Sequence, residues 1–237
     1  MKSPYVVQTQ AAPGSAVFDE GLRQHMLRVY NYIGLGLVLT GLVAYLVAAT
    51  PAIYQPIFGT PLKWVVMLAP LGFVFFFSFR LHAISAATAQ ALYWAFCALM
   101  GLSLASVFLV YTGTSIARTF FITASMFGAT SLYGYTTKRD LSKLGSFLLM
   151  GLIGVVIASL VNLFVGSSAL QFAISIIGVL VFTGLTAYDT QNIKEQYAEA
   201  SGSEANSKLA VWGALSLYLN FINIFQLLLG FTGQKEE

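Results

Sequence analysis

The chain has 237 residues, of which 57% are hydrophobic and only 9% are charged. This balance leaves too little polar surface for a water-soluble globule of that length, so it predicts a multi-pass membrane protein. The formal net charge of +3 comes from basic residues that fall mainly between apolar segments, which indicates membrane topology and no nucleic-acid partner.

The first 29 residues are polar and include Pro13, Gly14 and Ser15. They contain no apolar core followed by a small-residue cleavage site, so they lack the pattern of a cleaved signal peptide. The first apolar segment is therefore expected to direct the chain to the membrane. We expect residues 1–25 to form a flexible cytoplasmic segment and residues 26–237 to form one transmembrane domain.

Seven apolar runs follow, and each is long enough, at roughly 20 residues, to cross a bilayer as a helix. The break at residues 191–208 is rich in Glu, Ser, Gly and Asn, which is typical of a solvated loop. The sequence thus predicts an all-α membrane protein with seven transmembrane helices. The predicted spans are residues 30–50, 62–79, 89–111, 115–136, 144–165, 170–189 and 209–231.

The positions of Lys and Arg near the span ends predict the orientation, because cytoplasmic loops carry an excess of them. With the N-terminus inside, most of the basic residues fall on the cytoplasmic side. We therefore expect a cytoplasmic N-terminus and a C-terminus on the opposite side. The cytoplasmic set is Lys2, Arg23, Arg28, Arg80, Lys138, Arg139, Lys143, Lys194 and Lys208, and the opposite set is Lys63, Arg118 and Lys235.

Asp189 stands at the end of the sixth run, after an almost unbroken stretch of apolar residues. A carboxylate at or inside a span is energetically costly unless it is paired or hydrated, so such a residue is a functional candidate by default. The competing interpretation is a hydrated carboxylate at the membrane surface that has no function.

A polar stripe crosses the last predicted span, where Ser216, Asn220 and Asn223 recur at i, i+4 and i+7. We expect this stripe to face the interior of the bundle and not the lipid. Hydrogen bonding between helices would also explain neutral polar side chains, and taken alone it is the simpler explanation. The stripe indicates a functional site only if it lies beside Asp189.

Several enzyme classes lack the residues that they need. Cys97 is the only cysteine, and His25 and His82 lie far apart, so neither a disulfide framework nor a Cys/His metal cluster is expected. The last span has no Lys for retinal, and no predicted span holds a His for an intramembrane serine protease. We expect no enzymatic activity and no cofactor.

Three motifs carry a family resemblance. Tyr188-Asp189-Thr190-Gln191 is followed by Ile193-Lys194, residues 214–223 read ALSLYLNFIN, and residues 133–141 read YGYTTKRDL. Together with the seven-span layout, they resemble the bacterial branch of the Bax inhibitor-1 family from about Arg23 onward. The resemblance implies a bacterial inner-membrane protein in which the other six helices surround the final helix.

The resemblance also implies a pH-sensitive calcium leak in which one acid from the sixth helix and one from the seventh form the gate. Carried over by position, Asp189 is the first acid, a proton sensor and a calcium ligand, and Arg80 is a basic latch. Asn220 stands in place of the second acid, while Ser216 and Asn223 would complete a polar path. Because two neighbouring carboxylates share a proton and Asp beside Asn does not, we expect weaker proton gating or gating centred at lower pH.

Two alternatives stay open. Arg80 can equally be a topology signal whose side chain reaches the lipid headgroups. The protein can also be a regulator that transports nothing, because bacterial relatives resemble modulators of a membrane-anchored ATP-dependent protease. Residues 1–25 would then be the segment offered to that partner. The sequence does not indicate an oligomeric state.

Overall fold

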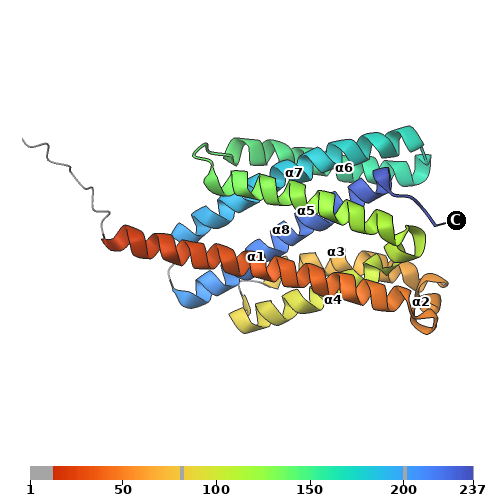
Figure 1. Ribbon diagram of the computed structural model, residues 1–237, viewed down its shortest axis with the longest axis horizontal. Coiled ribbons are helices and arrows are strands. Elements are labelled where there is room, and N and C mark those ends of the chain that lie inside the picture. The colour runs from red at the N-terminus through yellow and green to blue at the C-terminus, as the bar shows by residue number, and fades with distance from the viewer. Residues whose placement is uncertain (1–12, 81–82, 200–201, 237) are drawn as a thin grey trace, which may run out of the picture.

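The computed structural model describes residues 13–80, 83–199 and 202–236, and within these ranges the fold is entirely helical apart from one isolated β-bridge (Figure 1). The predicted all-α class is confirmed. Eight helices are formed: α1 Pro13–Ala48, α2 Pro51–Phe58, α3 Leu62–Arg80, α4 Ala86–Val110, α5 Gly113–Thr136, α6 Ser142–Val165, α7 Ser168–Glu199 and α8 Ser203–Thr232.

Six of these helices are long and apolar enough to cross a membrane: α1, α3, α4, α6, α7 and α8. The helix α5 has 24 residues, which is long enough, but it is rich in Thr, Ser and Gly and carries Arg118. Its composition is therefore more polar than that of the other long helices. The structure thus has six clearly apolar spans where the sequence predicted seven.

The structure contains more helix between the predicted spans than the sequence indicated. The segment 191–208, predicted to be a solvated loop, is mostly helical, because α7 continues to Glu199 and α8 begins at Ser203. The proline-rich break after the first span contains the short helix α2. At the N-terminus, α1 begins at Pro13 inside the predicted flexible segment, whose residues 1–12 lie outside the described ranges.

The last helix lies inside the bundle. In Figure 1, α8 runs between α5, α6 and α7 on one side and α1, α3 and α4 on the other. It packs directly against α1, α4, α5 and α7, and it is the most buried of the six apolar helices.

Aromatic side chains join α8 to α1 and α4. The ring of Tyr218 meets the rings of Tyr93 and Phe96 edge to face, at centroid distances of 6.3 and 5.7 Å. All three side chains are fully buried, and the Tyr218 hydroxyl lies 2.6 Å from the hydroxyl of Thr40 on α1. This contact satisfies the polar end of a large apolar side chain in the core.

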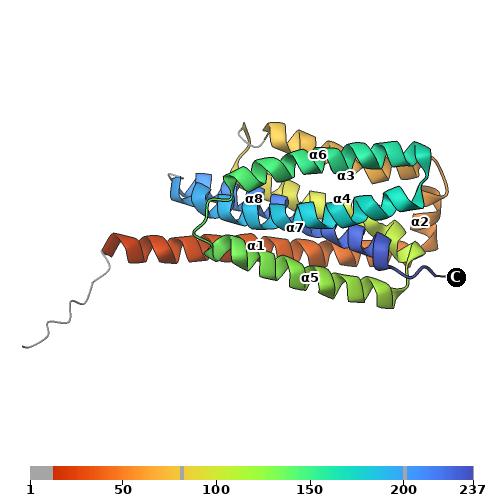
Figure 2. The same ribbon diagram turned by 90° about the horizontal axis from the view of Figure 1, so that it is seen from above.

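The two ends of the described chain lie at opposite ends of the bundle, as both views show (Figures 1 and 2). The C-terminal segment is attached to the connection between α4 and α5 by two backbone hydrogen bonds. Thr112 N donates to Gln234 O over 3.0 Å, and Glu236 N donates to Val110 O over 3.0 Å. The C-terminus therefore shares one end of the bundle with the start of α5.

Candidate functional site

Asp189 meets the polar stripe of α8. Ser216 Oγ donates to Asp189 Oδ2 over 2.7 Å, and Asn220 Nδ2 donates to the same oxygen over 2.8 Å. The carboxylate lies inside α7, ten residues before the helix ends, because α7 extends past the apolar run. Asp189 is half-buried, and it faces α8 in the interior of the bundle.

These side chains line a cavity of about 480 Å³, whose walls come from α3, α4, α6, α7 and α8. Asp189, Ser216, Asn220 and Asn223 all contribute to it, so the structure brings the predicted polar residues together. Asn223 Nδ2 donates to Leu219 O of its own helix over 2.7 Å and forms no hydrogen bond with Asp189. Most of the remaining lining is apolar.

Sequence reasoning missed two polar residues of this cavity, Gln226 on α8 and Ser103 on α4. Gln226 continues the spacing of the stripe, since it follows Asn223 by three residues, so the helical period could have identified it. Nothing comparable marks Ser103, which is one of many small polar residues in apolar helices.

The predicted latch is not formed in this structure. Arg80 is exposed at the end of α3, and within the described ranges it makes neither a hydrogen bond nor an ion pair with Asp189. The only ion pairs among the described residues join Glu20 to Arg23 and Glu204 to Lys208. Asp189 is therefore held by neutral donors alone.

The residues beside Asp189 attach α7 to three further elements. Thr190 Oγ1 lies 2.9 Å from Ser131 Oγ on α5, and Ser131 in turn lies 2.7 Å from the Tyr30 hydroxyl on α1. The ring of Tyr188 packs so closely on Gly145 of α6 that a methyl group there would collide with it. These contacts fix the orientation of α7 at the level of Asp189.

Gln191 attaches α7 to the loop between α5 and α6. Its Oε1 accepts from Leu141 N over 2.8 Å, and its Nε2 donates to Arg139 O over 2.8 Å. The bond to Leu141 N is buried, so that N–H group receives a partner away from water, whereas Arg139 is an exposed residue. The loop motif at residues 133–141 and the motif at residues 188–191 are thus parts of one structural unit.

The chemistry of the cavity is that of one carboxylate among neutral groups. Within the described ranges, no group of three or more His, Cys, Asp or Glu side chains could hold a metal ion. Hard cations such as Ca²⁺ prefer six to eight oxygen ligands. A single carboxylate with neutral neighbours supplies fewer charged oxygens than a tight site for such a cation usually has.

A bundle with six helices that are long and apolar enough to cross a membrane, and with one carboxylate in a largely apolar cavity between them, defines a multi-pass integral membrane protein. The sequence model of the family described as inhibitor of apoptosis-promoting Bax1 matches residues 22–237. The chain belongs to this Bax inhibitor-1 family, as the three motifs predicted.

Relatives of high similarity occur in distant bacteria. The chain is 51% identical over 220 residues to an uncharacterized protein of Rickettsia prowazekii, covering 93% of each chain. It is 45% identical to the inner membrane protein YbhL of Escherichia coli, over 91% of this chain and 93% of the relative. An uncharacterized membrane protein of Streptococcus pyogenes is 35% identical, with 98% and 99% covered. The names of the last two relatives agree with a membrane location.

Proposed function

We propose that the protein is a cation leak of the bacterial inner membrane that passes calcium, with Asp189 as ion ligand and proton sensor. One observation carries the proposal: the Asp189 carboxylate lies on the wall of a largely apolar cavity inside the bundle and has no basic partner among the described residues. A carboxylate in such a place has to take up a proton or a cation, because a lone buried charge is costly.

The competition between proton and cation supplies the pH dependence of this proposal. Low pH favours the protonated carboxyl, which attracts a cation weakly, and higher pH favours the ionised form that binds it. Asn220 adds a neutral amide beside Asp189 and no second acid, so the protein is expected to couple transport to protons more weakly than a chain with two acids.

The proposal includes seven spans, with α5 as the seventh. At about 1.5 Å per residue the 24 residues of α5 extend roughly 36 Å, which is enough for a hydrocarbon core of about 30 Å. Arg23, Lys138 and Lys143 lie at the end of the bundle where α1 begins, whereas Lys63 and Lys235 lie at the other end. This distribution favours a cytoplasmic N-terminus.

Calcium flux into liposomes reconstituted with the purified full chain tests the proposal, with measurements from about pH 5 to about pH 8. We expect flux that depends on pH in the native protein, and flux that is lower and nearly independent of pH in Asp189→Asn. Glu236→Gln is the matched control, because Glu236 is exposed near the C-terminus and does not line the cavity, so its replacement should leave the flux unchanged.

Flux equal to that of empty liposomes at every pH would reject the leak. The function would then be the partner-binding regulator, for which removal of residues 1–12 is the decisive change. That deletion should abolish regulation of a membrane-anchored ATP-dependent protease, whereas a leak centred on Asp189 should survive it.

A further inference from the structure

A second cavity, of about 490 Å³, lies between α1 and α5 and is separate from the Asp189 cavity. Four of its lining residues, Arg23, Met26, Leu27 and Tyr30, follow the i, i+3, i+4, i+7 pattern of one face of α1. The facing wall is one face of α5, from Phe127 to Tyr135. Its volume falls within the range of roughly 300 to 1,000 Å³ that is typical of ligand pockets.

The cavity is apolar and open toward the region that lipid occupies. Leu27 and Leu132 on its walls are exposed, and a Cβ atom added at Gly128 would meet no atom within 4 Å. At the far end, the Tyr30 hydroxyl lies 2.7 Å from Ser131 Oγ and joins the two helices. A hydrocarbon chain from the bilayer therefore fits the space between them.

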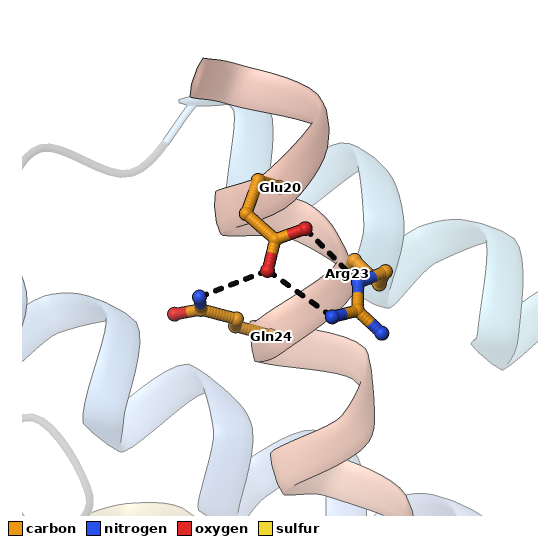
Figure 3. Close-up of polar contacts among 3 residues, drawn as sticks. All are labelled: Glu20, Arg23 and Gln24. Carbon is orange, nitrogen blue, oxygen red and sulfur yellow. Dashed lines mark hydrogen bonds and ion pairs between the residues drawn. The ribbon is translucent and has the colours of Figure 1, made fainter. Parts of the chain in front are cut away.

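Arg23 stands where a lipid headgroup would lie, in the first turn of the first membrane span. Its Nε and Nη2 donate to the two carboxylate oxygens of Glu20 over 3.0 and 3.2 Å, while Gln24 Nε2 also donates to Glu20 over 3.0 Å (Figure 3). From Arg23 to Tyr30 the cavity extends roughly 10 Å along α1, at about 1.5 Å per residue.

Both Glu20 and Arg23 can form further hydrogen bonds in addition to those between them. A guanidinium has five N–H donors, of which Glu20 takes two, and Figure 3 shows the remaining nitrogen of Arg23 pointing away from Glu20. The carboxylate of Glu20 still has room for one more donor. The pair therefore offers donors suited to a phosphate and, beside them, an acceptor suited to an ammonium group.

We propose that this cavity binds one phosphatidylethanolamine molecule, with the phosphate on Arg23, the ammonium on Glu20 and an acyl chain between α1 and α5. The opposite charges of the pair match the opposite charges of this headgroup. A net anionic headgroup would place negative charge beside Glu20, and choline has no N–H to donate to it. The proposal requires only that the chain lies in a membrane, so it is independent of the proposed leak.

Native mass spectrometry of the full chain in detergent can test this inference. Phosphatidylethanolamine, phosphatidylcholine and phosphatidylglycerol with identical acyl chains are added in turn, and the dissociation constant of the first bound lipid is measured. We expect phosphatidylethanolamine to bind most tightly. Gly128→Leu fills the space between α1 and α5 that the acyl chain would occupy, so it should weaken the binding of phosphatidylethanolamine about tenfold. Gly154→Leu on α6 is the matched control, because a side chain there also meets open space.

The headgroup contacts are tested by two exposed substitutions that leave the fold intact. Arg23→Gln should weaken all three lipids about tenfold, and Glu20→Gln should weaken phosphatidylethanolamine while it strengthens phosphatidylglycerol. Glu204→Gln, at the other ion pair, should change the binding of neither phosphatidylethanolamine nor phosphatidylglycerol. Equal binding of the three headgroups by the native chain, or equal effects of Gly128→Leu and Gly154→Leu, would overturn the proposal.

Discussion

Asn220 Nδ2 donates a hydrogen bond of 2.8 Å to Asp189 Oδ2 across 31 positions of the sequence. A carboxyl group at position 220 would therefore face Asp189 directly, and two acids at that distance share a proton. We expect Asn220→Asp to raise the pH midpoint of calcium flux by about one unit or more. Asn223→Asp is the control, since Asn223 bonds its own helix, and an equal shift in both variants would contradict the direct pairing.

Gln191 is expected to be a major source of stability at the Asp189 end of the bundle. Gln191→Ala removes partners from Leu141 N and Arg139 O, and unpaired buried groups are costly. The free energy of unfolding should fall by about 2 to 4 kcal/mol, as measured by titration with a denaturing detergent. Gln234→Ala, at an exposed position, should change it by less than about 0.5 kcal/mol.

The buried His25 is expected to lower the free energy of unfolding of the native chain. Its side chain is buried, its Nε2 has no hydrogen-bond partner among the residues that the structure describes, and its ring lies 4.9 Å from that of Tyr197. His25→Phe keeps the ring contact and removes the buried polar atom, so it should raise the free energy of unfolding by about 1 to 2 kcal/mol. His25→Ala loses the packing and should lower it. A destabilised His25→Phe would mean that the imidazole is bonded in the native protein.

Asp140, just before α6, is expected to make a pH-dependent contribution to the stability of the fold. The hydrogen bonds from Ser142, one of them from its backbone N over 2.8 Å, lower the pKa of Asp140 below its ordinary value of 3.8. A group with a lowered pKa stabilises the fold above the ordinary value and loses this effect as the pH falls through the lowered one. Asp140→Asn should therefore melt at a lower temperature than the native chain at pH 7.

This difference in melting temperature should close as the pH falls below 3.8, because the native carboxyl then becomes neutral too. Thermal unfolding followed by circular dichroism at stepped pH values measures it. A difference that stays the same at every pH would show that the charge of Asp140 has no part in it.

The path of α5 can be tested by labelling single cysteines in a Cys97→Ala chain, since Cys97 is buried in α4. Thr114 and Lys138 are exposed near opposite ends of α5. If α5 crosses the membrane, an impermeant maleimide should label Thr114→Cys in intact spheroplasts and Lys138→Cys only after lysis. Labelling of both, or of neither, before lysis would reject the seventh span.

Hydrophobicity located the membrane segments better than it located the helix ends. The predicted span 144–165 agrees with α6 (Ser142–Val165), whereas α7 continues ten residues past Asp189. Apolar content reports where lipid surrounds the chain, and a helix can continue into water when its polar residues find tertiary partners. Gln191 and Lys194 are such residues, since Lys194 Nζ donates to Tyr135 O over 3.0 Å.

The candidate site was predictable in part. The period of 3.6 residues placed Ser216 and Asn220 on one face, and the cost of a buried carboxylate required polar neighbours for Asp189. The position of Arg80 relative to Asp189 was not predictable in this way. It depends on how α3 packs against the rest of the bundle, which is a tertiary property that no local pattern encodes.

The attachment of α7 also limits how the Asp189 cavity can change its width. Residues 188–191 contact α5, α6, α8 and the loop between α5 and α6, so α7 cannot turn about its axis without breaking several contacts at once. By contrast, α3 packs chiefly against α2 and α4, and it carries Pro70 on the cavity wall. A proline inside a helix removes one backbone hydrogen bond and weakens it there. We therefore expect α3 to move more readily than α7 when the cavity changes its width.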